Sequence, residues 1–407
     1  MYAVIIATVL ALTSFSIKPN PRAPTAAAVL EHAVDDADLV VHLDVAATVG
    51  ANYGVLASLP EDALVKQVPE LRQQLTQAVM QLESGRTMAR AMLGFDPVTA
   101  LTSVTAFVRM REGMPQPEFL LVVRGTLPAD LPAKLASSLG GRTGSVDGRT
   151  TVTLPDGTVM GTSRSGALLV GKAEWVNARV ASAWRAPAHA KGSPWGRIGS
   201  ALDGRPFFLV ASKAAPALVA TLAKGLGDNF GRDLVANHKL GVLAVSATGV
   251  TWMYEASDAA FARRMESASL GLLELMRAAH LAPRGMAQVA VAALPSYARL
   301  SKDLDAVIGA RDKLLAAVWD LTGDGKFTAR VRVDGTLVTA TATGKKLSDV
   351  LPISFVGGLA VIGFLADSDD PTPVPPASKP PAVRPAPRPA PVPPRKGTSL
   401  GAPVKTR

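Results

Sequence analysis

Short runs of alternating or continuous apolar residues recur through the middle of the chain, and glycine, aspartate and proline separate them. Such runs, bounded by turn-forming residues, are typical of β-strands. Aspartate–glycine pairs at 147–148, 156–157 and 334–335 favour tight turns, because both residues tolerate positive φ. We therefore expect strands at Leu39–Leu43, Ser103–Arg109, Glu118–Arg124, Thr150–Leu154, Thr158–Thr162, Ala167–Val170, Arg205–Ala211, Leu240–Ser246, Val250–Glu255, Lys326–Val333 and Thr336–Thr343.

Apolar residues at spacings of three and four predict helices between these strands. The clearest case runs from Pro60 to Arg90, where we expect one or two amphipathic helices with apolar residues at Leu64, Val68, Leu71, Leu75, Val79 and Leu82. Further helices are expected at Pro128–Leu139, Ala173–Trp184, Ala214–His238 and Asp258–Ala279. Helices between antiparallel hairpins predict an α+β fold rather than a doubly wound parallel sheet.

The order strand, helices, hairpin, helix and closing hairpin occurs twice along the chain. We interpret the body as two diverged halves, residues 29–200 and 201–346, each built from antiparallel hairpins and helices. This interpretation rests on the order of the elements and not on residue identity between the halves.

Uncharged apolar runs flank this body. Tyr2–Ile17, followed by Ala26-Ala27-Ala28, is typical of a signal peptide cleaved after Ala28 or of an N-terminal anchor over residues 1–28. The second run, Val350–Ala366, predicts either a transmembrane helix or a helix that closes the core, within residues 347–366. The charges around these runs indicate opposite membrane orientations, so the orientation stays open.

Residues 367–407 form a tail rich in proline, alanine and arginine, which we expect to be disordered. From Pro371 to the end the tail has seven basic and no acidic residues, so this part holds seven of the ten net positive charges of the chain. The body is thus nearly neutral and offers no basic face for a phosphate backbone, which argues against nucleic acid as a partner. We expect the tail either to bind a protein or an anionic polymer, or to be a solvated linker.

Several motifs suggest chemistry, and each has a simpler structural interpretation. Gly166–Lys172 has phosphate-loop spacing as far as the lysine, but residue 173 is alanine and the apolar residues between the glycines predict a buried strand. Asp320–Gly325 resembles the start of a calcium loop, but Val331 stands where that loop requires glutamate. Trp175 and Trp184 lie on opposite sides of one predicted helix, so one is expected in the core.

The densest group of polar residues with metal-binding side chains precedes and enters the first strand. His42 and Asp44 would point to the same face of that strand, where they could serve a divalent cation or only pack. The remaining members of the group are Glu31, His32, Asp35, Asp36 and Asp38. The chain has no cysteine and no serine-nucleophile signature, so we assign no catalytic, cofactor-binding or metal-binding residue and expect no cofactor.

The strand Asp38–Asp44, at the start of a duplicated α+β body between apolar ends, resembles a loose group of uncharacterised exported bacterial proteins. The resemblance implies a location in the bacterial cell envelope, periplasmic or membrane-anchored, and carries no functional residues. We therefore expect a non-enzymatic binding or scaffolding protein that contacts the membrane through its terminal apolar segments. The alternatives are an exported hydrolase with a dispersed active site and a cytoplasmic protein whose tail docks a polyproline-binding partner.

Overall fold

The computed structural model describes residues 24–62, 65–67, 69–111, 116–184, 194–201, 205–214, 230–247, 249–274 and 328–344, with further helical positions at 216, 219–220, 288–289, 292, 309, 312, 315–316 and 319. All of them belong to one compact unit, Met1–Val356. The apolar runs 2–17 and 350–366, the segment 320–325 and the tail lie outside the described residues, and the expectations about them stay predictions. Among the described helices, none is long and apolar enough to cross a membrane.

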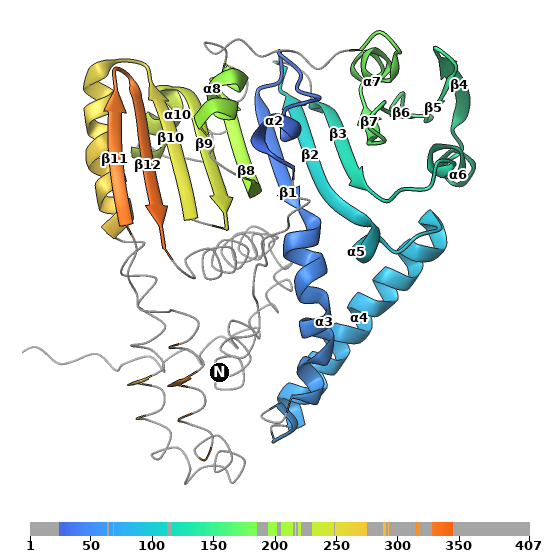
Figure 1. Ribbon diagram of the computed structural model, residues 1–407, viewed down its shortest axis with the longest axis horizontal. Coiled ribbons are helices and arrows are strands. Elements are labelled where there is room, and N and C mark those ends of the chain that lie inside the picture. Colours follow the sequence, from blue (N-terminus) through green and yellow to red (C-terminus); the bar gives the residue numbers. More distant parts are fainter. Residues whose placement is uncertain are drawn as a thin grey trace, which may run out of the picture. The chain divides into compact units, whose positions relative to one another are not determined.

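A twelve-stranded antiparallel sheet with helices between its strands confirms the predicted α+β class. Across the sheet the order is β11–β12–β10–β9–β8–β1–β2–β3–β7–β6–β5–β4, and Figure 1 shows β11 at one edge. The strands are β1 Leu39–Asp44, β2 Leu101–Arg109, β3 Glu118–Gly125, β4 Arg142–Val146, β5 Arg149–Thr153, β6 Val159–Thr162, β7 Leu168–Gly171, β8 Pro206–Lys213, β9 His238–Ser246, β10 Gly249–Ala256, β11 Thr328–Asp334 and β12 Leu337–Thr343.

The two halves of the sheet repeat one pairing order. β1, β2 and β3 form a meander, and β3 then pairs with β7, whose other neighbour is β6. In the same way β8, β9 and β10 form a meander, and β10 pairs with β12, whose other neighbour is β11. β1 and β8 pair with each other, Leu39–Leu43 against Phe208–Ser212, so the sheet is continuous from one half to the other.

Helices fill the connections between strands, and several begin at a polar cap. The Asp96 carboxylate accepts a hydrogen bond from the Val98 amide at the start of α5, and Asp258 does the same for Phe261. α6 ends at Gly140, whose φ of 68° suits a left-handed cap. The helices are α2 Ala26–Val29, α3 Ala51–Ser58, α4 Pro69–Leu93, α5 Pro97–Ala100, α6 Leu131–Leu139, α7 Ala173–Val180, α8 Pro194–Ala201, α10 Phe230–Ala236 and residues 259–274, with short helical turns η1 Ala46–Gly50, η2 Leu59–Glu61 and η3 Val65–Gln67.

The largest core cluster covers one face of the central strands. Val40, Phe107 and Leu209 lie on β1, β2 and β8 and are fully buried. α2, α7 and α8 pack on them through Ala26, Val29, Trp175, Val176, Val180, Trp195 and Ile198. A cut after Ala28, at the predicted cleavage point, would therefore remove Ala26, which is packed in this core.

The opposite face of the second half packs against the helix formed by residues 259–274. Phe261 and Met265 of this helix contact Tyr254 on β10 and Val338 on β12, and all four side chains are buried. Because successive strand residues point to opposite faces, the outer strands of this half supply apolar side chains mainly to this face.

Two expectations from the sequence differ from the structure. The predicted helix 173–184 ends at Val180, because the Asp147 carboxylate accepts hydrogen bonds from the Ser182 amide and hydroxyl and draws the chain away. Trp175 is buried as one of the two tryptophans was expected to be, but Trp184 lies beyond the helix, under the Arg179 guanidinium. Strand β4 was not predicted, because its polar residues show no apolar alternation.

Gly171 at the end of β7 offers a direct test of the sheet packing. A Cβ atom added there would lie 2.0 Å from the Phe119 carbonyl oxygen, and the backbone φ is 153°. Gly171→Ala should therefore lower the free energy of unfolding by at least about 3 kcal/mol, measured by urea denaturation. Gly85→Ala, in open space on α4, should instead raise it by roughly 0.5–1 kcal/mol. Equal effects of the two changes would contradict the close approach of β3 and β7.

Candidate functional site

His42 is buried on β1 and is held as a neutral imidazole. Its Nδ1 lies 2.9 Å from the Thr105 hydroxyl oxygen on the neighbouring strand β2. The pKa of His42 is lowered to about 4, mainly by burial and in addition by the Arg124 charge, while the Pro206 carbonyl acts in the opposite direction. No hydrogen bond of normal geometry reaches Nε2. At neutral pH the side chain is therefore an uncharged packing group of the sheet.

His42 and Asp44 point to the same face of β1, as the sequence predicted. The Asp44 carboxylate, however, accepts a hydrogen bond of 2.8 Å from the Ala47 amide and so caps the helical turn that follows. Other acidic residues of the group are also engaged: Asp36 pairs with Arg109, and Asp38 accepts from the Met110 amide. Among the described residues, no three metal-binding side chains converge to hold an ion.

A second buried histidine, His32, lies beside a serine and a carboxylate, the combination that an exported hydrolase would use. The Ser165 hydroxyl oxygen is 3.5 Å from His32 Nε2, and a Glu31 carboxylate oxygen is 3.8 Å from the same nitrogen. A catalytic relay needs the serine and the carboxylate on opposite ring nitrogens. Here both approach Nε2, and among the described residues Nδ1 has no hydrogen-bond partner, so these three side chains do not form a relay.

Two arginines give this cluster a structural role instead. Arg179 on α7 donates to the backbone carbonyls of His32 and Ala33, and Arg124 on β3 donates to the Ala28 carbonyl and to Glu31. Burial lowers the pKa of His32 to about 4, with the charges of both arginines acting in the same direction and Glu31 opposing. The cluster thus fastens residues 28–33 across the sheet.

The segment with phosphate-loop spacing, Gly166–Lys172, forms a turn and strand β7. β7 pairs with β3 on one side and β6 on the other, so its amides are committed to the sheet and cannot cradle a phosphate. Lys172 forms ion pairs with Glu118 and Glu174.

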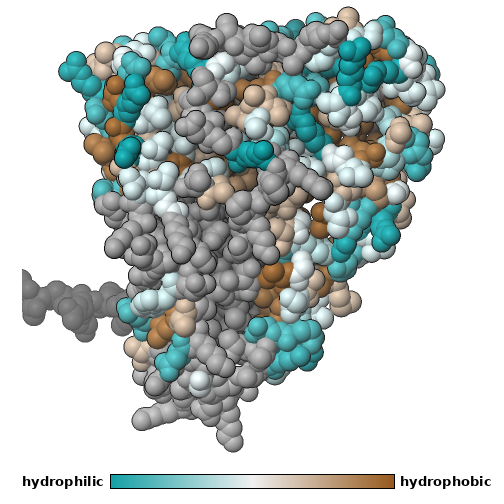
Figure 2. Space-filling model, in the orientation of Figure 1, coloured by the Kyte–Doolittle hydropathy of each residue, from teal (hydrophilic) through white to brown (hydrophobic). Residues whose placement is uncertain are grey.

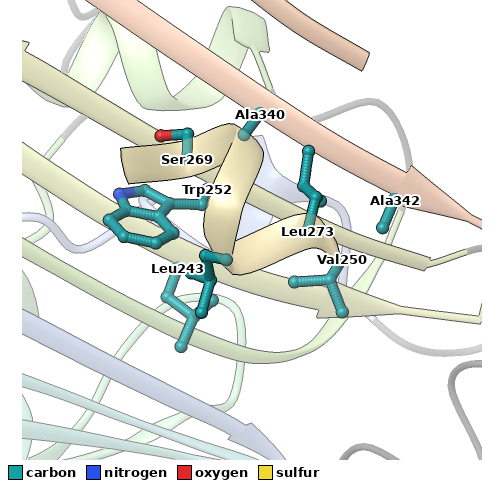
Figure 3. Close-up of a pocket in the computed structure, with 8 residues that line it drawn as sticks. Leu243, Val250, Trp252, Ser269, Leu273, Ala340 and Ala342 are labelled. Carbon is teal, nitrogen blue, oxygen red and sulfur yellow. The ribbon is translucent and has the colours of Figure 1, made fainter. Parts of the chain in front are cut away.

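A small apolar cavity lies between the helix 259–274 and strands β9, β10 and β12. Figure 3 shows Trp252 and Ala340, which are neighbours on the paired strands β10 and β12, and Leu273 of the helix among the residues that line it. Its volume is about 50 Å³, well below the several hundred Å³ of typical ligand pockets. We interpret it as a packing gap rather than as a ligand site.

Within the described part of the chain, helix α4 has one half-buried stripe that faces the rest of the protein. Its half-buried positions recur every three or four residues, at Leu75, Val79, Glu83, Arg86, Ala89 and Leu93. Arg86 fixes this side: its guanidinium pairs with Asp96 and lies 4.6 Å from the centre of the Tyr53 ring on α3. The N-terminal end of α4 is also held by an ion pair, between Arg72 and Glu61, and Glu61 pairs with Lys66 as well.

The side of α4 away from this stripe is exposed and carries no charge from residue 73 to residue 92. We call it the outer face of α4; it consists of Gln73, Gln77, Met80, Gln81, Ser84, Met88, Ala91 and Met92. The side chains of Met80, Met88 and Met92 are 66%, 63% and 52% exposed. Exposed methionines on an uncharged helix face are typical of surfaces that bind another protein. This face is our candidate functional site.

The outer face was not singled out in the sequence, although a signal for it was present. The predicted helix was defined by a periodic set of leucines and valines, of which Leu75 and Val79 are half-buried, and the set includes neither Met80 nor Met88. The signal that could have found the face is the absence of charge on one side of the helix over five turns.

Comparisons with known proteins do not place the chain in a family. No family model matches it, and no curated protein does. A solved structure described as crystal form I of TP0453 is similar over 83% of this chain and 98% of its own, with 13% sequence identity and a TM-score of 0.33. A likeness of this size carries no argument about function.

The two buried histidines predict an acid-sensitive fold. Their pKa values are about 4 in the folded protein and 6.5 when exposed, so between these pH values the unfolded chain binds protons that the folded protein does not. The free energy of unfolding should fall as the pH drops through this window, by up to about 3 kcal/mol for each histidine.

The double variant His42→Leu/Thr105→Val removes one of these titrations and leaves no unpaired hydroxyl behind. The free energy of unfolding, measured by urea denaturation between pH 7 and pH 4.5, should depend less steeply on pH in this variant. The difference in slope from the unaltered protein should correspond to about one proton. An unchanged slope would mean that His42 is not buried as a neutral group.

Proposed function

We propose that this protein is a non-catalytic binding and scaffolding module of the bacterial cell envelope, and that it assembles with a second copy of itself through the outer face of α4. The envelope location is supported by the apolar run Tyr2–Ile17 and the small residues that follow it. The assembly is supported by the uncharged, exposed outer face, which is the observation that carries the proposal.

Transfer of the outer face from water into an interface carries only a small desolvation penalty. It holds methionine, alanine, serine and glutamine, so no charge must be desolvated on docking. The unbranched methionine side chains adapt their shape to an opposing surface, and glutamine amides can hydrogen-bond across a helix pair. The charged residues Arg72, Arg86 and Arg90 lie on other sides of the helix.

The face is also self-complementary. Met80 and Met88 lie four residues on either side of Ser84, and Gln77 and Ala91 lie seven residues on either side. Two copies of α4 that cross antiparallel at Ser84 therefore place Met80 of one against Met88 of the other, as a two-fold interface requires. The small Ser84 side chain at the centre permits close approach of the two helices.

The contact is expected to be weak. One helix seam of about twenty residues buries less area than the roughly 1,600 Å² of a standard interface. We therefore expect a dissociation constant on the order of 10 µM, so that the copies exchange at low concentration and assemble where they are concentrated at a surface.

The absence of cysteine makes a sharp test possible. In Ser84→Cys the only thiol of each chain lies on the proposed two-fold axis, so mild oxidation of the full chain should give a disulfide-linked dimer. In the control Arg90→Cys the thiol is also exposed on α4, about 120° around the helix, and should remain monomeric. Equal crosslinking of both variants, or of neither, would contradict assembly through this face.

A second variant separates assembly from crosslinking chemistry. Met80→Glu/Met88→Glu places like charges opposite each other and should raise the dissociation constant of the cysteine-free protein at least tenfold in analytical ultracentrifugation. Far-ultraviolet circular dichroism and the melting temperature should stay unchanged, because both side chains are exposed. A monomeric unaltered protein at about 100 µM would overturn the proposal.

The envelope location is tested by protease accessibility in intact spheroplasts that express the full chain. We expect the body to be digested without lysis, while a cytoplasmic marker protein survives. A body that is digested only after lysis would place it in the cytoplasm and remove this part of the proposal.

A further inference from the structure

Strand β11 forms one edge of the described sheet. It pairs with β12 on one side over seven residue pairs, and among the described strands none lies on its other side (Figure 1). The outward backbone amides and carbonyls of such a strand can pair with a further strand. β11 is thus a place where an extended peptide could be added to the sheet.

The two sides of β11 differ in character. Ala329, Val331 and Val333 are half-buried and face the helix formed by residues 259–274. Arg330 and Arg332 point to the opposite face and are exposed, above Thr341 and Thr339 of β12. Figure 2 shows hydrophilic side chains over this edge of the sheet, beside hydrophobic ones.

Neither Arg330 nor Arg332 forms an ion pair or hydrogen bond within the part of the chain that the structure describes, and they lie two residues apart on one edge strand. Arg109, for comparison, pairs with Asp36 and Glu118, and Arg124 pairs with Glu31. Two unpaired cations side by side on a strand repel each other unless an anion lies between or opposite them.

The spacing of these cations defines the anion. Residues i and i+2 of a strand lie about 7 Å apart on one face, and the same repeat holds in any strand added beside it. A peptide with acidic residues at alternate positions would therefore place one carboxylate opposite Arg330 and another opposite Arg332. Its intervening residues would extend the apolar side of the sheet beside Val331.

A second copy of β11 does not meet this requirement. In an antiparallel pair centred on Val331, Arg330 of one copy would oppose Arg332 of the other, and like charges directly opposite each other are destabilising. In this register the two arginines disfavour edge-to-edge pairing of identical chains, and the same charges favour an acidic strand.

We propose that β11 is a docking edge for an extended peptide segment of a partner protein, with acidic residues alternating with small apolar ones. The segment adds to the sheet as a thirteenth strand: its backbone pairs with β11, and its carboxylates pair with Arg330 and Arg332. This site is separate from the outer face of α4, and neither proposal depends on the other.

The test uses the full chain and fluorescein-labelled peptides in anisotropy titrations at low salt. Thr-Val-Glu-Val-Glu-Val-Thr should bind, and the permuted peptide Thr-Val-Val-Glu-Glu-Val-Thr, whose adjacent carboxylates point to opposite faces, should bind at least tenfold more weakly. Two further peptides block backbone amides by N-methylation, one at the two glutamates and the other at the three valines. Only alternate amides of an added strand face β11, so one of these two peptides should lose binding and the other should keep it.

Charge reversal identifies the edge. Arg330→Glu/Arg332→Glu should weaken binding of the alternating peptide at least tenfold and create binding of its lysine counterpart. The control Arg142→Glu/Arg164→Glu makes the same charge change on exposed residues of β4 and the β6–β7 turn and should have no effect. Equal binding of alternating, permuted and N-methylated peptides, or no binding at 1 mM protein, would overturn the proposal.

Discussion

The antiparallel pairing of β1 with β8 is the contact on which the rest of the structure depends. β1 lies at the centre of the sheet, with β2 on one side and β8 on the other, so each half completes its sheet by pairing with the other half. Val40 on β1 lies between Phe107 and Ala211, and all three belong to one core cluster. Loss of the pairing between β1 and β8 would expose one apolar strand edge on each half of the sheet. We therefore expect the twelve strands to unfold as one cooperative body.

The continuity of the sheet limits which of its surfaces remain exposed. The central strands are paired on both sides and covered on one face by α2, α7 and α8, and the buried histidines near them are held as neutral packing groups. The surfaces that combine exposure with unusual chemistry lie away from the centre, on α4 and on β11. Our two proposals concern these outlying surfaces, while among the described residues Ser165, His32 and Glu31 pack together without the geometry of a catalytic relay.

Much of the local structure follows from the sequence because strand periodicity and turn chemistry are local properties. The hairpin at Asp334-Gly335 and the strands β2 and β3 were predicted within two residues, since their apolar residues alternate around glycine turns. The pairing of β3 with β7 is not a local property, and neither is the burial of Val29, Leu30 and Val34 ahead of the first strand. The outer face of α4 was not predicted from the sequence, because its defining feature is the absence of charged residues rather than the presence of a motif.

The central claim, that the pairing of β1 with β8 makes one cooperative body, is tested most directly by native-state hydrogen exchange. We predict that the amides of Val41 and Val210, on the two paired strands, exchange only through global unfolding, with the same free energy in both halves and the same denaturant dependence. If β8–β12 exchanged at a free energy several kcal/mol below that of β1–β7, the halves would unfold separately. The continuous sheet would then not be the foundation of the protein.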